Sequence, residues 1–399
     1  MLKTFIKKKY ISKLSEEQKF KILIILLKIL RLFSYKRGYI CVDNLYEKHA
    51  SCIDAYTIFE YLKQHKKKSY YIIWKENLTF EKISKQNLII LEKAGAPNSS
   101  NYQFLRKSFR ALINCKYFIS SFYGSLPSKF RNFLLCEKSI RLVGIGHGPV
   151  FFKTLVFDFP FCQDKEWDYY LVSSEYEKEI FLSHGWSKNK LIVNSLPRFD
   201  WCREKTEKSQ RKIFMMLTWR LTFEDDKNYI FSSKYLYNLF HFLNNKTLNN
   251  LLSENNIELV LGLHHALQDI CCVDIDFPVK IANTNNLISE INSSDLFITD
   301  YSSIFFDSAY LNHPCIFWRI DSDDKFLNDI DKRDWKNVLE KDCDVYNVVY
   351  DENELILKIA TYIKNNFKLE DEYSEKMNKF FSTRKNNTEQ FIKILETKK

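Results

Sequence analysis

Three of the eight glycines in the chain, Gly144, Gly146 and Gly148, fall within five residues and bracket His147. Gly144 lies within a mainly apolar run at residues 141–145 that predicts a strand, and the other two glycines follow that run. Because glycine tolerates positive φ angles and lets a ligand approach the backbone closely, this spacing predicts a tight turn that displays the imidazole at the strand's end. A histidine placed there can act as general base on a hydroxyl near neutral pH. The alternative is a turn histidine that only caps backbone groups.

Hydroxyl groups gather at a second place, where a predicted strand at residues 296–299 runs into a predicted helix at 303–311. Thr299, Ser302 and Ser303 stand at this junction. A helix start offers unpaired N–H groups and a partial positive charge, so the junction is typical of a phosphate site. Ordinary N-capping by one serine is the alternative, and it accounts for only part of the cluster.

Three further side chains follow predicted strands and can reach the same rim: Arg198, Arg220 and His264. An arginine in such a position either binds a diphosphate or pairs with a carboxylate at the surface, and both interpretations stay open. His264 stands beside His265, and consecutive side chains diverge, so the pair does not form a metal site. We expect no metal and no cofactor.

Short apolar runs alternate with helix-like segments along the chain, which predicts parallel, doubly wound sheets. The first series has predicted strands at 39–42, 70–74, 88–91, 117–120, 141–145, 169–172 and 191–193, with helices near 51–64, 101–114 and 175–183. After a polar stretch at 203–212, the second series has strands at 213–217, 258–263, 279–282, 296–299 and 315–318, with helices near 233–252, 286–293 and 303–311. Ligands of such sheets bind at the carboxyl ends of the strands, so we expect the site between two lobes.

Composition supports a folded, two-domain protein with anionic partners. The 399 residues exceed one domain of roughly 100–200 residues. A net charge of +10 favours nucleotides, phosphate polymers or anionic lipid, and no motif supports nucleic acid binding. The ten cysteines show no CxxC pair, which predicts free thiols in a reducing compartment. No cleavable signal peptide is expected, because a long charged segment precedes the apolar run near the N-terminus.

That apolar run, residues 21–33, is too short between its charges for a membrane-spanning helix of about 20 residues. As a helix it places Lys21, Lys28 and Arg31 on one narrow face, opposite a broad Ile/Leu face. This pattern is typical of a helix that lies on anionic lipid. The alternative is that the apolar face packs on the protein's own core.

Taken in order, these segments resemble the CDP-glycerol glycerophosphotransferase family, the polymerases of teichoic acids and of phosphate-linked capsules. The family's His-Gly turn is similar to His147-Gly148, and its strand-end histidine to His264. Its Pro-Arg-x-Asp and Thr-Trp-Arg motifs are similar to residues 197–200 and 218–220. Its most specific motif, Ile-Thr-Asp-Tyr-Ser-Ser followed by two aromatic residues and Asp, is matched unbroken by residues 298–307.

The resemblance implies an α/β fold of the GT-B type, with two Rossmann-like domains and a cleft between them. We expect a basic amphipathic segment at 1–38, an acceptor domain at 39–205 and a donor domain with a helical tail at 206–399. By the same resemblance His147 is the base, and His264 acts with it on the phosphoryl group. The expected donor contacts are Gly148, Arg198, Thr218, Trp219, Arg220, Thr299, Ser302, Ser303 and Asp307.

The implied reaction moves glycerol phosphate or ribitol phosphate from a CDP-polyol to a hydroxyl of a teichoic acid or capsule polymer and releases CMP. The expected location is the cytoplasmic face of the cell membrane, as a peripheral protein on an anionic membrane surface. One alternative is a GT-B glycosyltransferase that uses a nucleotide sugar in surface polysaccharide synthesis. Another is a membrane-bound scaffold without activity that binds anionic polymer through its basic surface.

Overall fold

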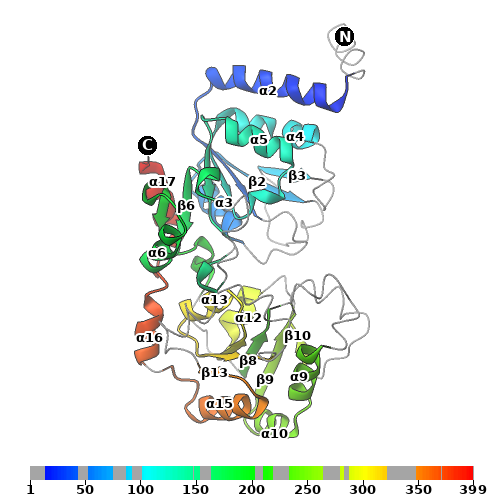
Figure 1. The fold of residues 1–399 in the computed structure, drawn as a ribbon, viewed down its shortest axis with the longest axis vertical. Helices are drawn as coiled ribbons and strands as arrows, with labels where there is room; N and C mark the ends of the chain where they lie inside the picture. Colours follow the sequence, from blue (N-terminus) through cyan, green and yellow to red (C-terminus); the bar gives the residue numbers. More distant parts are fainter. Residues whose placement is uncertain are drawn as a thin grey trace.

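Two parallel β-sheets, one in each lobe, form the framework of the protein in a computed structural model (Figure 1). The structure describes residues 14–43, 53–74, 87–91, 101–146, 148–152, 163–202, 210–218, 233–263, 279–282, 287–320, 347–369 and 371–398. The first sheet has the strand order β3-β2-β1-β4-β5-β6-β7, and the second has β10-β9-β8-β11-β12-β13. In each sheet the strands that directly follow β1 or β8 lie on one side of it and the later strands lie on the other side, as in a doubly wound fold. The expected α/β class with two such lobes is confirmed.

The N-terminal lobe is built from buried apolar strands joined by helices. Its strands are β1 (Gly38–Val42), β2 (Ser69–Trp74), β3 (Leu88–Leu91), β4 (Cys115–Ser120), β5 (Arg141–Gly144), β6 (Tyr169–Val172) and β7 (Leu191–Val193). Its helices are α2 (Glu16–Leu32), α3 (Asp54–Gln64), α4 (Asn101–Asn114), α5 (Ser128–Cys136) and α6 (Glu175–Ser183). A short 3-10 helix, η9 (Pro197–Trp201), follows the last strand.

The C-terminal lobe repeats the pattern. Its strands are β8 (Arg211–Met216), β9 (Ile257–Gly262), β10 (Lys280–Ile281), β11 (Leu296–Thr299), β12 (Cys315–Trp318) and β13 (Asn347–Val349). The helices are α9 (Lys234–Leu243), α10 (Lys246–Glu254), α12 (Leu287–Ser293), α13 (Phe305–Tyr310), α15 (Glu352–Lys364), α16 (Asp371–Asn378) and α17 (Asn387–Thr397).

The predicted helix at 233–252 is wrong in one respect, because the structure has two helices there. The side chain of Asn245 accepts hydrogen bonds from the N–H groups of Thr247 and Leu248, at 2.9 and 3.2 Å. Asparagine is among the best N-cap residues, so a new helix begins after it. Helix α5 and strand β13 were not predicted, whereas every predicted strand overlaps a strand of the structure.

The last helix, α17, leaves the C-terminal lobe and packs on the N-terminal one, against η9, α3 and β7 (Figure 1). The Tyr117 hydroxyl of β4 donates a hydrogen bond of 3.0 Å to the carbonyl of Leu395. Phe391 and Leu395 are fully buried. The expected domain at 206–399 therefore contains a helix that belongs, by its contacts, to the first lobe.

Helix α2 lies along the end of the N-terminal lobe that faces away from the C-terminal lobe (Figure 1). The prediction of a basic stripe on α2 is wrong for Arg31, which is buried and donates hydrogen bonds to the carbonyls of Cys115 and Ser139, at 2.9 and 3.1 Å. A guanidinium can be buried here because its N–H groups find acceptors in the backbone carbonyls of Leu112, Cys115 and Ser139. No helix of the described residues is long and apolar enough to span a bilayer.

The same helix carries two apolar faces, so both interpretations of its Ile/Leu residues have support. One face packs on the lobe through Phe20 and Leu27, which are buried. The other is open to solvent, where the exposed side chains Ile22, Ile25, Leu26, Ile29, Leu30, Leu32 and Phe33 recur at helical spacing.

Candidate functional site

The glycine turn after β5 lies where the two lobes meet. Gly146 has a φ of +61°, which favours glycine. A Cβ atom at Gly148 would lie 3.2 Å from the hydroxyl oxygen of Ser303 and 3.3 Å from Nη2 of Arg198. Ser303 belongs to the C-terminal lobe, so glycine at position 148 lets the two lobes approach. His147 itself lies outside the described residues.

The junction between β11 and α13 presents hydroxyl groups to this turn. Ser302 and Ser303 are half-buried and precede α13. Thr299 is fully buried, and its hydroxyl donates to the carbonyl of Met216 at 2.7 Å. Thr299 therefore holds β11 against β8, and the two serines are the hydroxyl groups that remain accessible. Helix α13 has only six residues, so donor groups rather than a helix dipole would act on a phosphate.

The Thr-Trp-Arg segment begins at the same rim. The backbone N–H of Thr218 donates to Oδ1 of Asp300 at 2.7 Å, and the N–H of Tyr301 donates to the same oxygen at 2.6 Å. The Asp300 carboxylate thus fixes the start of this segment beside the serine junction. Trp219, Arg220 and His264 lie outside the described residues.

Arg198 and Asp307 form an ion pair across the lobes. The guanidinium donates from Nε to Oδ1 of Asp307 at 2.8 Å and from Nη2 to Oδ2 at 3.0 Å. Its Nη1 donates to Oδ2 of Asp54 at 2.8 Å. Arg198 and Asp307, both predicted to contact the donor, therefore bind each other in the structure. Their direct contact with a donor stays a prediction.

The loop after the glycine turn is held by a buried carboxylate. Glu177 of α6 accepts a hydrogen bond of 2.7 Å from the N–H of Val150, and a second one from the N–H of Ser173. Burial raises the pKa of this carboxyl, and its hydrogen bonds oppose that shift. Residue 150 is three positions after His147, so α6 fixes the chain close to the predicted base.

The match to a family model decides the classification of the chain. The model of CDP-glycerol:poly(glycerophosphate) glycerophosphotransferase matches residues 27–394, which includes both sheets and most of α17. The chain belongs to this glycerophosphotransferase family.

Curated relatives of this family member act in teichoic acid synthesis. The chain is 27% identical over 229 residues to the minor teichoic acid biosynthesis protein GgaB of Bacillus subtilis, covering 53% of the chain and 24% of GgaB. It is 25% identical over 328 residues to the teichoic acid poly(glycerol phosphate) polymerase of Bacillus spizizenii, covering 74% of the chain and 77% of that protein. The chain thus spans only a quarter of the first of these relatives.

Solved structures agree on the fold. A structure of the wall teichoic acid polymerase TagF soaked with CDPG matches with a TM-score of 0.63 at 16% identity, covering 99% of the chain and 97% of TagF. A putative UDP-N-acetylglucosamine 2-epimerase from Listeria monocytogenes matches with a TM-score of 0.59 at 12% identity, covering 91% and 96%. At these identities the likeness concerns the two-lobed fold alone.

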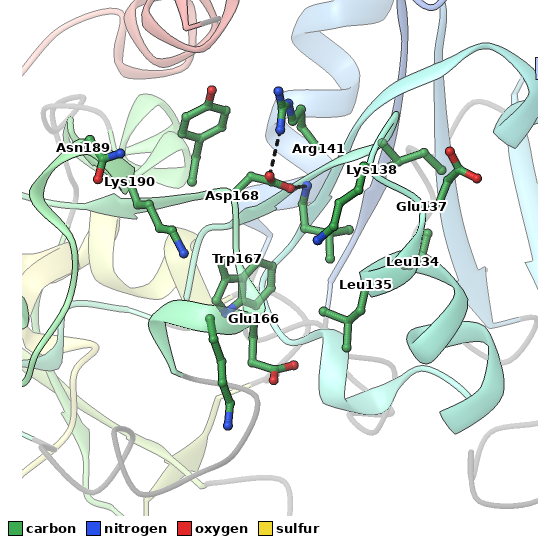
Figure 2. A pocket seen from close by; sticks show the side chains of 14 residues that line it. Leu134, Leu135, Glu137, Lys138, Arg141, Glu166, Trp167, Asp168, Asn189 and Lys190 are labelled. Carbon is green, nitrogen blue, oxygen red and sulfur yellow. Dashed lines mark hydrogen bonds and ion pairs between the residues drawn. The ribbon is translucent and has the colours of Figure 1, made fainter. Parts of the chain in front are cut away.

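A pocket of about 290 Å³ lies at the amino ends of β5 and β6 (Figure 2). It is lined by residues that begin strands, among them Arg141 and Tyr169, and by Trp167 and Asp168. Arg141 and Asp168 pair at 3.1 Å, as the dashed line in Figure 2 shows. Because the motifs of this glycerophosphotransferase family member meet at the carboxyl ends of the strands, the pocket is not part of that meeting point.

Two residues of the site region carry no recognisable pattern in the sequence. Asp54 begins an ordinary helix, and Glu177 stands in a charged helical segment. Their role shows only when distant segments are brought together. Among the residues that the structure describes, no group of three or more His, Cys, Asp or Glu side chains is arranged to hold a metal ion.

Proposed function

We propose that this chain transfers a polyol phosphate from a CDP-activated donor to a hydroxyl group of a teichoic acid or a related phosphate-linked capsule polymer. The observation that carries the proposal is the approach of Gly148 to Ser303, which brings the His-Gly turn and the Asp-Tyr-Ser-Ser motif of the family together across the lobes. Family membership over residues 27–394 supports the same reaction class.

In the proposed reaction an acceptor oxygen attacks the phosphorus next to the polyol, and the bond from that phosphorus to the bridging oxygen of the diphosphate breaks. CMP leaves, and a phosphodiester forms. His147 takes the proton of the attacking hydroxyl, because a neutral imidazole is a suitable base near pH 7. His264 stabilises the charge on the transferring phosphoryl group, as donors aimed at a developing charge do.

The remaining predicted contacts hold the donor in the C-terminal lobe. Ser302 and Ser303 donate to the diphosphate from the start of α13, and the absence of a side chain at Gly148 lets the turn approach them. Trp219 and Arg220 complete the donor site, and arginine is well matched to phosphate oxygens. Thr218 and Thr299 shape the rim through contacts with Asp300 and Met216.

We also propose that the protein acts at the cytoplasmic face of the cell membrane and binds it through α2. The exposed apolar face of this helix supports the proposal, since Ile25 is 59% exposed and Phe33 is 86% exposed. Monomeric soluble proteins rarely leave such a row uncovered. With Arg31 buried, the contact is mainly apolar, and Lys21 and Lys28 add attraction to anionic lipid.

The reaction is tested by incubating purified protein with CDP-glycerol, CDP-ribitol and nucleotide sugars, each with and without a poly(glycerol phosphate) oligomer. Release of CMP that depends on the oligomer is the expected result, and the preferred donor identifies the polyol. Release of a nucleoside diphosphate from a nucleotide sugar would point to glycosyl transfer. No turnover with any donor would favour a scaffold without activity.

A further inference from the structure

We infer that the segment Pro197–Asp200 sets the relative position of the two lobes, and that Arg198 within it is a positioning residue for the reaction. Its catalytic consequence rests on the proposed function, whereas the coupling of the lobes rests on geometry alone. Beyond residue 300, Arg198 and Phe199 contact α13, and Asp200 contacts the start of α17.

Arg198 joins one carboxylate from each lobe. Asp54 stands at the first position of α3 in the N-terminal lobe, and Asp307 lies in α13 of the C-terminal lobe. The three side chains are almost fully buried, with 5% of Arg198, none of Asp54 and 3% of Asp307 exposed. Asp54 also accepts the backbone N–H of Arg198 at 2.8 Å, so the segment is fixed to the first lobe before the side chain reaches the second.

Buried pairs of this kind confer geometry more reliably than stability. Removing one partner leaves an uncompensated charge in the interior, which is strongly unfavourable. The bidentate contact between the guanidinium and Asp307 also restricts the angle at which α13 can approach. The pair is therefore suited to hold one arrangement of the lobes.

Asp200 connects the same segment to the returning helix. Its carboxylate accepts the N–H groups of Asn387 and Thr388, both at 2.8 Å. These are the first residues of α17, whose own N-cap residue, Asn386, makes no side-chain hydrogen bond to it. An Asp at a helix N-terminus satisfies unpaired donors and complements the helix dipole. Asp200 thus caps α17 from 187 positions earlier in the chain.

Phe199, between Arg198 and Asp200 in the sequence, adds apolar contacts to the same part of the C-terminal lobe. Its ring is fully buried and stacks on Tyr310 of α13, with centroids 4.7 Å apart. It also meets the edge of Phe381, at 5.4 Å, in the stretch between α16 and α17. Ring pairs of this geometry are favourable beyond the area they bury.

The consequence for the reaction follows from Gly148. A Cβ atom at Gly148 would lie 3.3 Å from Nη2 of Arg198 and 3.2 Å from the Ser303 hydroxyl oxygen, so the turn packs against both the guanidinium and the serine junction. If the ion pair between Arg198 and Asp307 is lost, we expect α13 and Ser303 to move relative to the glycine turn. A shift of about 1 Å between reacting groups can lower turnover roughly 100-fold.

The test compares Asp307→Asn and Arg198→Lys with the wild type, using Asp168→Asn as matched control because it breaks an Arg–Asp pair remote from the lobe contact. In Asp307→Asn the amide N–H group would face one of the guanidinium N–H groups, so one of the two hydrogen bonds from Arg198 would be lost. Lysine keeps the charge but cannot bridge two carboxylates in bidentate fashion. Small-angle scattering, differential scanning calorimetry, CDP-glycerol affinity and the turnover number for CMP release are measured on each protein.

We expect Asp307→Asn to increase the radius of gyration, to split the thermal transition and to lower turnover roughly 10- to 100-fold. Donor affinity should change less than about threefold, Arg198→Lys should be intermediate, and the control should match the wild type. A tenfold or larger loss of donor affinity with unchanged scattering would overturn the inference in favour of direct donor contact. Unchanged scattering, thermal transition and turnover in both variants would also overturn it.

Two of these measurements separate this inference from the proposed function. If wild-type protein releases no CMP, the function fails, while scattering and calorimetry still decide whether the segment couples the lobes. If Asp307→Asn does not fold, Arg198→Lys carries the same test, because it removes no charge from the interior.

Discussion

The carboxylate of Asp43, at the end of β1, accepts a hydrogen bond of 3.0 Å from the hydroxyl of Tyr71 in β2. Both side chains are buried. The same carboxylate accepts the N–H groups of Ala55 and Tyr56 at 3.1 and 3.0 Å, so it caps α3 from the neighbouring strand. Burial, with the nearby Asp54 carboxylate, raises the pKa of Asp43 to about 7.

This pKa predicts a pH dependence of stability. Between the ordinary value of 3.8 and about 7, the unfolded chain releases the Asp43 proton while the folded chain keeps it. The free energy of unfolding from this group therefore falls as pH rises, by at most about 1.4 kcal/mol per pH unit, and levels off above 7. Urea unfolding of wild type and Asp43→Asn from pH 4 to 8 measures the difference. The wild type should lose stability relative to the variant as pH rises; a constant difference would contradict the raised pKa.

Replacing His147 by Asn should lower turnover by roughly 10²–10⁴-fold with donor affinity nearly intact, because a general base acts in the transition state. Asn keeps hydrogen-bonding capacity, so a histidine that only supports its turn would tolerate the change. His264→Asn should damage both turnover and donor affinity, since a phosphate contact exists before the reaction as well. Steady-state CMP release and calorimetric titration with CDP-glycerol measure the two effects. Near wild-type turnover in a folded His147→Asn protein would contradict the role of His147 as general base.

Replacing Ser302 and Ser303 together by Ala should weaken binding of CDP-glycerol by about 1–3 kcal/mol, the usual loss for hydrogen bonds to a charged group. Thermal stability should change little, because both side chains are only half-buried. Ser253→Ala, on an exposed position of α10, is the matched control. Titration calorimetry gives the affinities, and equal affinity in all three proteins would remove the phosphate-binding role.

Membrane binding should depend more on the apolar face of α2 than on its lysines. Ile25→Ser with Ile29→Ser should abolish sedimentation with anionic vesicles, since about 0.8 kcal/mol is lost for each CH₂ group that leaves the lipid. Lys21→Gln with Lys28→Gln should reduce it only at low salt, where charge attraction is least screened. Both pairs lie on exposed positions, so folding is preserved. Sedimentation of the isoleucine variant at the wild-type level would refute the apolar contact.

The sequence could predict the two sheets because their strands are short runs of apolar residues with separated helices. Strand β13 is only three residues long, and α5 has no side-chain cap, so neither carries a strong local pattern. Helix α2 was recognisable as amphipathic, but periodicity alone could not tell which of two apolar faces packs on the lobe. The burial of Phe20 and Leu27 and the hydrogen bonds of Arg31 to Cys115 and Ser139 decide that.

The junction between β11 and α13 was predictable because its motif, residues 298–303, is contiguous. The candidate site was not predictable where contacts join distant positions. Asp54 and Arg198 stand 144 positions apart, and Arg198 and Asp307 stand 109 apart. An arginine after a strand is equally compatible with phosphate and with carboxylate, so only the fold shows which anions surround it.

The capping of α17 by Asp200 has a consequence for how the chain is made. Ribosomes deliver residues in order, and α17 emerges after the whole second lobe. Until then, the first lobe lacks the helix that covers Tyr117 and places Phe391 and Leu395 in its core. The first lobe therefore exposes the apolar surface that α17 later covers for as long as the second lobe is being synthesised. A chain that stops before residue 387 would leave that surface open to chaperones and proteases, so only a chain carrying α17 can complete both lobes.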